Sequence, residues 1–323
     1  MKLKRILRSV AAILASATPV LLSTGGVSLA ATPGTGADCV VGTAGYPTIQ
    51  SAVDNPGCET ISVPAGTFRE NVLINGTVID HTNITIRGAG PAYTIVDGSN
   101  APGAVFSVVK GRRAGPCGEP EVAVTLQGMT ITGGTSAWCP PDNPRCTQRN
   151  GGGVAGAPGT KLIVKNCTVS GNSAYMNGGG ISVAAGRLTV LDSVVSGNTA
   201  YGNPQPDVTD PNYIGGGGGI RIAGCPGVLI VSNSVIERNV SHRHGGGILS
   251  FTRASAVTTP TTPPVTMAFP AGTLVVEGSD IKNNTAADAN GGGGVFYDAP
   301  DLTLIKGKVK NNYPDDLRPG ATP

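Results

Sequence analysis

The sequence contains few aromatic and few charged residues. Phe, Trp and Tyr make up 4% of its 323 residues and Asp, Glu, Lys and Arg 13%, whereas Gly occurs 49 times. Few large side chains are therefore available to build a core. Helix bundles and doubly wound folds need long segments rich in Leu, Ala, Glu and Lys, and this composition disfavours them. It favours strands that stack and are joined by tight turns.

The sequence also lacks a long apolar run after residue 30. The first thirty residues hold four basic residues, an apolar run from Val10 to Leu22 and the site Ser28-Leu29-Ala30, which predict a signal peptide cleaved near Ala30. Its removal lowers Lys+Arg from 23 to 19 against 20 Asp+Glu, so the formal net charge changes from +3 to −1. We therefore expect a secreted or cell-surface protein without a transmembrane segment and without affinity for nucleic acid.

Seven cysteines in an exported chain predict disulfides, and the odd number leaves at least one thiol either unpaired or paired between molecules. Cys139 and Cys146 bracket the loop PPDNPR and form one candidate pair. Cys39 and Cys58 form a second, which would tie down the N-terminal segment. The sequence assigns no partner to Cys117 or Cys225.

A repeat dominates the second half of the chain. Five copies begin at a Leu that precedes an Asn by ten residues, such as LIVKNCTVSGN from Leu162 and LIVSNSVIERN from Leu229. Apolar residues alternate within each copy, and Gly-rich blocks follow most of them. About 26 residues forming three short strands cannot bury their own apolar face, so the units must stack. The pattern predicts an all-β, single-stranded right-handed parallel β-helix of about eight coils over residues 61–312.

The Asn of each copy has a structural interpretation. Asn tolerates left-handed corners, and its side-chain amide can bond the equivalent Asn above and below it. We therefore expect a ladder formed by Asn172, Asn198, Asn239, Asn284 and Asn312. Cys167 occupies the position of Ser193, Ser234 and Ser279, which predicts a small buried thiol and not a nucleophile.

Both ends of an open stack need protection. Residues 31–60 are expected to form an N-terminal cap segment with a short helix, in which Thr48 is the N-cap and Ile49, Ala52 and Val53 cover the first coil. Residues 313–323 are expected to form a Pro-rich C-terminal tail. There, Asp315, Asp316 and Arg318 would discourage the addition of a further strand.

Two segments resemble known families. YPTIQSAVDNPGCETISVPAGTFRENVLI and the following NITIRGAGPAYTIVDG resemble the N-terminal coils of the pectin-lyase-like superfamily, which includes pectinesterases and pectate lyases. The GGGI and N-x-A copies are similar to repeats of secreted bacterial β-helix proteins related to polymorphic outer-membrane proteins. The resemblance implies a polysaccharide or cell-envelope context. Because the superfamily contains enzymes and non-enzymes, it does not fix an activity.

The catalytic motifs of these enzymes match only in fragments. Gln127 in TLQGMTI is a loose match to a pectinesterase residue, and Arg243-His244-Gly245 departs from the G-H-G element of polygalacturonases. Val78-Ile79-Asp80-His81 matches three letters of the W-I-D-H element of pectate lyases. No complete catalytic set is present.

Insertions between the Asn corners and the Gly blocks alternate in length, which predicts a groove with two walls. Its floor would carry Tyr175 and Met176. One wall would present Trp138, Asp142, Arg145 and Arg149, and the other Tyr201, Asp207, Asp210 and Tyr213. Aromatic rings can cover the apolar face of a sugar, so Trp138, Tyr175, Tyr201 and Tyr213 are the candidate carbohydrate-binding residues. Alternatively, Trp138 packs the base of its own loop.

Candidate catalytic residues are those that a polysaccharide lyase would need, namely a base and carboxylates that hold Ca²⁺ against a uronate. They are Arg145, Arg149, His242, Arg243, His244, Asp207 and Asp210. Asp207 and Asp210 are equally explained as solvated turn residues, and His242 and His244 as exposed histidines without a third metal ligand. No metal site is predicted, and Ca²⁺ is expected only for a lyase.

The function favoured by the sequence is that of a secreted or cell-surface, monomeric protein with a carbohydrate-associated binding or structural role. The alternative is a polysaccharide lyase or another pectin-active enzyme, such as a pectinesterase-like one, that acts on uronate-containing glycans. An enzyme would bring basic and carboxylate side chains together in one groove, whereas a structural protein would scatter them. The Thr/Pro-rich segment 252–270 is expected to be an extended loop.

Overall fold

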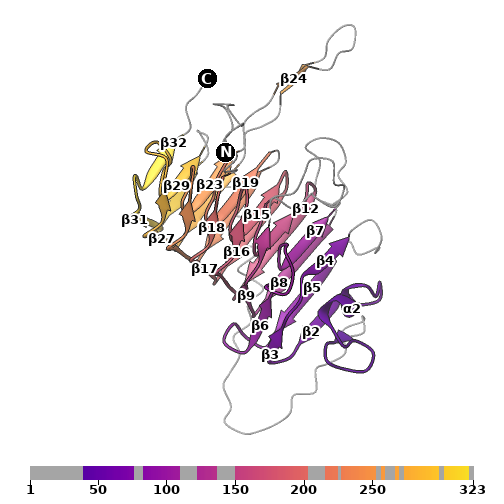
Figure 1. Ribbon diagram of the computed structural model, residues 1–323. Coiled ribbons are helices and arrows are strands. Elements are labelled where there is room, and N and C mark those ends of the chain that lie inside the picture. The colour runs from indigo at the N-terminus through magenta and orange to yellow at the C-terminus, as the bar shows by residue number, and fades with distance from the viewer. Residues whose placement is uncertain are drawn as a thin grey trace. The chain divides into compact units, whose positions relative to one another are not determined.

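The computed structural model forms one compact unit over residues 34–323. It describes residues 39–75, 83–109, 122–136, 150–202, 215–224, 227–251, 256–258, 266–268, 273–297 and 302–319. The strands belong to four parallel sheets, called A to D here, and to one short antiparallel pair (Figure 1). The predicted signal peptide and the boundary at residue 30 lie outside the described residues.

Sheet A contains the longest row of strands and sheet B runs beside it. Sheet A consists of β1 (Cys39–Val40), β2 (Thr60–Val63), β5 (Asn83–Gly88), β8 (Val122–Gln127), β12 (Thr160–Lys165), β16 (Arg187–Leu191), β20 (Val228–Ser232), β26 (Thr273–Glu277) and β30 (Leu302–Ile305). Sheet B consists of β3 (Gly66–Phe68), β6 (Thr94–Asp97), β9 (Thr130–Thr132), β13 (Thr168–Ser170), β17 (Val194–Ser196), β21 (Val235–Glu237), β27 (Asp280–Lys282) and β31 (Lys308–Lys310).

Sheets C and D complete the coils. Sheet C consists of β4 (Val72–Asn75), β7 (Phe106–Val109), β11 (Val154–Gly156), β15 (Ile181–Ala184), β19 (Ile220–Ala223), β23 (Ile248–Phe251), β29 (Val295–Tyr297) and β32 (Leu317–Pro319). Sheet D consists of β10 (Thr135–Ser136), β14 (Ser173–Ala174), β18 (Thr199–Ala200), β22 (Val240–Ser241) and β28 (Thr285–Ala286). In the repeats the chain passes through sheets A, B, D and C in turn, so each coil lies on the one before, and the predicted right-handed parallel β-helix is confirmed.

The core consists of rows in which one inward position repeats from coil to coil. Leu162 pairs with Leu188, which pairs with Leu229 and then Leu274, and all four side chains are buried. Burying such a side chain stabilises the fold by about 1.5–3 kcal/mol. The predicted extended loop 252–270 contains the antiparallel pair β24 (Ala256–Thr258) and β25 (Thr266–Ala268).

The five repeat Asn residues form a continuous ladder inside the coils. The Nδ2 of Asn172 donates to Oδ1 of Asn198 at 3.0 Å, and the same bond links each next pair down to Asn312 at 2.9–3.0 Å. Within each pair the backbone N–H of the first Asn also donates to the Oδ1 of the second, for example from Asn198 to Asn239 at 3.0 Å. The left-handed conformation belongs to the residue before each Asn, such as Gly171 (φ 66°) or Asn283 (φ 56°). The side chain of the ladder Asn, and not its backbone, therefore explains the repeat.

A second ladder runs one corner earlier. The backbone N–H of Cys167 donates to Oγ of Ser193 at 3.1 Å, and Ser193 donates in the same way to Ser234. The Cys167 thiol is free and buried, and it donates to the carbonyl of Lys165 at 3.2 Å. Burial raises the pKa of this thiol to about 11. Cys167 is thus protonated at neutral pH and does not act as a nucleophile.

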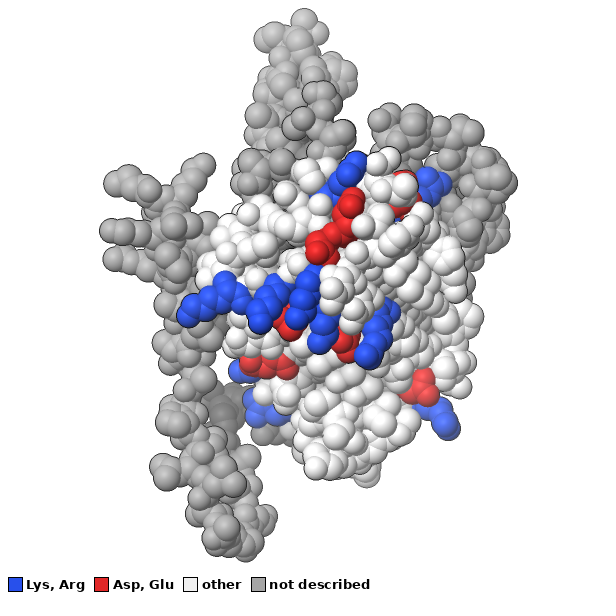
Figure 2. Space-filling model, turned by 90° about the vertical axis from the view of Figure 1, so that its left-hand side faces the viewer, with Lys and Arg blue, Asp and Glu red and all other residues white. Residues whose placement is uncertain are grey.

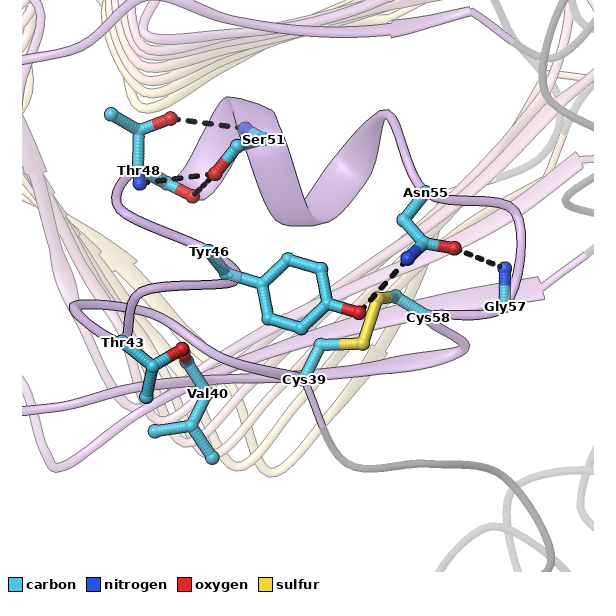
Figure 3. Close-up of a disulfide and its surroundings, with 9 residues drawn as sticks. All are labelled: Cys39, Val40, Thr43, Tyr46, Thr48, Ser51, Asn55, Gly57 and Cys58. Atoms are coloured by element: carbon cyan, nitrogen blue, oxygen red, sulfur yellow. Dashed lines mark hydrogen bonds between the residues drawn. A yellow bond between two sulfur atoms is a disulfide. The ribbon is translucent and has the colours of Figure 1, made fainter.

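A short helix covers the N-terminal end of the stack. Helix α2 (Ile49–Val53) begins after the N-cap Thr48, whose side chain accepts from the Ser51 N–H, and it packs its buried face on β2 and β4. A disulfide joins Cys39 to Cys58 beside it (Figure 3). The Asn55 side-chain amide donates to the hydroxyl of Tyr46 at 2.9 Å in the same cluster.

Two side chains fasten this helix to the following coils. The two carboxylate oxygens of Glu70 accept from the N–H groups of Ile49 and Gln50 at 3.1 Å each. The Gln50 amide accepts from the Leu73 N–H at 2.7 Å and donates to the Leu73 carbonyl at 3.1 Å. Leu73 lies in β4, the edge strand of sheet C. Gln50 therefore replaces the neighbouring strand that this edge lacks.

We expect Gln50→Ala to loosen this end of the molecule. It removes both hydrogen bonds to Leu73, each contributing about 0.5–1.5 kcal/mol. Amide hydrogen exchange at Leu73 should speed up by about tenfold, while exchange in the central coils stays unchanged. Gln127→Ala, in the middle of sheet A, serves as the control. Unchanged protection of Leu73 in the Gln50 variant would contradict the assignment.

The C-terminal end differs from the predicted tail. Residues 317–319 form β32, which pairs in parallel with β29 and so extends sheet C, instead of preventing strand addition. Oδ1 of Asp316 accepts from both the N–H and the Nδ2 of Asn312 at 2.9 Å each. A carboxylate can only accept, so Asp316 terminates the Asn ladder.

Charged side chains gather on the side of the molecule that carries β27 and β31. Figure 2 shows Lys and Arg there in a band with Asp and Glu between them. Glu237 lies 3.5 Å from Lys282 and 3.3 Å from Arg238. The two signs are mixed, which is typical of a solvated surface and not of an attractive field for a polyanion.

Candidate functional site

An aromatic column lies at the end of the sheet D strands. Tyr175, Tyr201 and His242 each follow one strand of this sheet, on successive coils. The Tyr201 N–H donates to the Ala174 carbonyl at 2.9 Å, and the His242 N–H to that of Ala200 at 2.9 Å. The three residues therefore occupy one position, repeated at the strand spacing of about 4.8 Å.

Two rings of this column, those of Tyr201 and His242, contact each other and reach the solvent. The ring centroids of Tyr201 and His242 are 5.1 Å apart, with 52° between the ring planes. Tyr201 is 43% exposed, His242 is exposed and Tyr175 is half-buried. Backbone register fixes where the rings are attached, because β14, β18 and β22 pair in parallel without an offset. The column is a preformed aromatic surface that spans three coils.

Arg243 lies next to the column. Its side chain crosses Gly202, and a Cβ atom on Gly202 would overlap it. Gly202 follows Tyr201 in the chain, so the guanidinium-bearing side chain reaches back from one coil to the previous one. Among the described residues no carboxylate lies within ion-pair distance of Arg243. A half-buried cation beside exposed aromatic rings is suited to an anionic group of a ligand.

His244 is held in a different environment from His242. Its ring lies 4.7 Å from the ring of Phe296, its Nε2 is 3.8 Å from Oδ2 of Asp288, and its Nδ1 is buried without a partner among the described residues. Burial is the main cause that lowers the pKa of His244. The negative charge of Asp288 raises this pKa, and the positive charge of Arg243 lowers it further. The lowered pKa favours the neutral ring, which packs on Phe296 with its Nδ1 enclosed.

The His244 environment predicts a pH-dependent stability. Since the pKa is lower in the folded than in the unfolded chain, the free energy of unfolding should be fully present above the unfolded pKa of about 6.5 and fall as the pH drops below it. Urea unfolding at pH 7.5 and pH 5.5 measures the loss. His244→Phe should reduce this loss, whereas His242→Gln, at an exposed position, should not. Equal pH dependence in wild type and His244→Phe would contradict the interpretation.

The predicted groove is described only in part. Its floor and wall residues Tyr175 and Tyr201 stand in one column on adjacent coils, and not on a floor and a wall. Met176, the other predicted floor residue, is half-buried, and its carbonyl accepts from the Gly202 N–H at 3.0 Å. The following predicted residues lie outside the described residues: Trp138, Cys139, Asp142, Arg145, Cys146, Arg149, Asp207, Asp210 and Tyr213. So do Cys117, Cys225 and Val78–His81.

The sequence carries a signal for the column that the lengths of the loops do not show. Each column residue follows a ladder Asn by three positions, as Tyr201 follows Asn198. Asp288 and Phe296, which surround His244, have no such signal because they come from the next coil. In the part of the chain that the structure describes, no three His, Cys, Asp or Glu side chains lie close enough to hold a metal ion. No helix there is long and apolar enough to cross a membrane.

Comparisons with solved structures return pectin methylesterases at low similarity. A pectin methylesterase of the rice weevil is 16% identical, with a TM-score of 0.38 over 93% of each chain. Pectin methylesterase PemA of Erwinia chrysanthemi is 13% identical, with a TM-score of 0.35 over 90% of this chain and 94% of that one. The Escherichia coli protein ybhc is 14% identical, with a TM-score of 0.40 over 89% of this chain and 77% of that one.

The chain forms a parallel β-helix. The pairing of its own strands carries this assignment. No family model matches the sequence, and no curated protein matches it.

Proposed function

We propose that this chain is a secreted or cell-surface protein that binds an acidic glycan on the aromatic column. The observation that carries the proposal is the column of Tyr175, Tyr201 and His242 with Arg243 beside it. Among the described residues Arg243 has no carboxylate as an ion-pair partner. Rings of this kind cover the apolar face of a sugar, while a guanidinium forms paired hydrogen bonds with a carboxylate or with hydroxyls. A uronate-containing glycan offers both features.

Binding, in a structural or recognition role, fits the described side chains better than catalysis does. Asp288 is the carboxylate next to the column, and it faces His244 at 3.8 Å. His244 in turn packs on Phe296 with its Nδ1 enclosed. This pair therefore acts on the stability of the turn that carries Arg243.

The proposal is tested by calorimetric titration of the chain with polygalacturonate, alginate and methylated pectin. We expect Tyr201→Ala to weaken binding of the acidic glycan by about tenfold, because one ring contact contributes about 0.5–1.5 kcal/mol beyond the area it buries. Tyr93→Ala is the matched control, since Tyr93 is 66% exposed and lies before β6 of sheet B, away from the column. Equal effects of both variants, or no binding to any of the three glycans, would refute the proposal.

The variant Arg243→Gln distinguishes the contribution of the ligand's carboxylates to binding from that of its sugar rings. It should weaken binding of polygalacturonate several-fold and leave binding of fully methylated pectin nearly unchanged, because only the former carries free carboxylates. Thermal unfolding of the variant checks that the turn is intact. A uniform loss on both glycans would assign Arg243 a purely structural role.

The enzymatic alternative is tested on the same samples. Unsaturated uronate ends, followed by absorbance with and without Ca²⁺, report a lyase, and release of acid from methylated pectin reports an esterase. Product that disappears on Asp207→Ala or Arg145→Ala would replace the binding role by a catalytic one that uses the predicted loops.

A further inference from the structure

The aromatic column has a direction and a length. Its positions are linked by backbone hydrogen bonds from one coil to the next, so the ring attachments follow one another along the axis of the β-helix at about 4.8 Å. This rise is comparable with the length of one pyranose unit in an extended glycan. A glycan that runs parallel to the axis would therefore place successive sugars beside successive rings.

The column ends at a defined residue. Ala287 occupies the next equivalent position, because its N–H donates to the Ser241 carbonyl at 2.8 Å, and it is exposed. It carries no ring. On the other side the Tyr175 N–H donates to the Ser136 carbonyl, and Tyr175 is the first described ring position of the column. Within the described residues the column thus has three ring positions and ends at Ala287.

Charge differs along the same line. Arg243 lies over Gly202, level with the Tyr201 and His242 part of the column, whereas Asp288 follows directly after Ala287. A carboxylate on the ligand is therefore attracted beside the column and repelled where the rings end. Ring positions and charges mark the same boundary.

We infer that the glycan runs along the β-helix axis with one sugar per coil, and that the column selects a segment of three sugars that ends at Ala287. This inference rests on the proposed function. It assigns Ala287 a role in specificity that its small exposed side chain would not otherwise suggest.

The test is a calorimetric titration with oligogalacturonides of two to six units. For the wild-type chain, affinity should rise up to the trimer and then level off. Ala287→Tyr should move the plateau to the tetramer and raise affinity for the longer oligomers by about three- to tenfold, the effect of one added ring contact. Tyr175→Ala should move the plateau down to the dimer. Ala289→Tyr, exposed in the same turn but off the column, should leave the plateau unchanged.

The outcomes separate the inference from the function on which it rests. Binding that grows steadily with length, or a plateau that neither Ala287→Tyr nor Tyr175→Ala moves, would overturn the axial arrangement and leave glycan binding intact. Failure of every oligomer and of polygalacturonate to bind would overturn both. Circular dichroism of each variant confirms that the coils are formed.

Discussion

Asn239→Leu should lower the free energy of unfolding by about 3–5 kcal/mol, because a buried network would lose its centre. Oδ1 of Asn239 accepts from the N–H and the Nδ2 of Asn198 at 3.0 and 2.9 Å. Its Nδ2 donates to Asn284 and to the Val195 carbonyl. Leucine has the same branching and the same number of side-chain heavy atoms but offers none of these groups, so buried donors and acceptors of both neighbouring coils would be left unsatisfied.

The measurement is equilibrium unfolding in urea, with Asn283→Gly as the control. Asn283 is exposed and has a φ of 56°, which glycine adopts freely, so its replacement should change stability by about half a kcal/mol or less. If Asn239→Leu cost no more than this control, the ladder would be a by-product of the coil geometry and not a source of stability.

Gly218→Ala should be similarly damaging, for a steric reason. A Cβ atom on Gly218 would lie 2.5 Å from the carbonyl oxygens of Gly246 and Val240, both of them backbone atoms of the next coil. Backbone cannot move aside as a flexible side chain does, so adjacent coils must separate. We expect a loss of about 3 kcal/mol or more, at the upper end of overpacking effects.

Gly197→Ala is the matched comparison for this effect. Gly197 has a φ of 62° and nothing within 4 Å of the position of a Cβ atom. Its replacement should cost about 1–2 kcal/mol of left-handed backbone strain alone. Thermal unfolding of both variants distinguishes crowding from conformation. A larger loss for Gly197→Ala would show that coil spacing tolerates the extra methyl group.

The repeat allowed much of the fold to be predicted. Alternating apolar residues identify the inward rows such as Leu162 and Leu188, and the shared spacing places the ladder Asn at one corner. The helix at Ile49–Val53 follows from its N-cap and apolar face. These features depend on local pattern and on stacking of equivalent positions, both of which are visible in a single sequence.

The features that escaped prediction depend on residues far apart in the chain. Gln50 completes an edge strand 23 residues away, and Asp316 terminates a ladder by standing in for an Asn that has no copy in the sequence. Loop length assigns Tyr175 to a floor and Tyr201 to a wall, whereas the offset of three residues from the ladder Asn places both in one column. Long insertions change the sequence spacing between equivalent positions of successive coils, whereas the backbone hydrogen bonds keep these positions aligned.

The most direct test of the binding surface is nuclear magnetic resonance of the chain labelled on its seven tyrosine rings, titrated with trigalacturonate. The account predicts that the ring signals of Tyr175 and Tyr201 shift with a common saturation curve, while those of Tyr46 and Tyr93 stay in place. Shifts confined to other tyrosines, or unchanged Tyr175 and Tyr201 signals under saturating ligand, would contradict it.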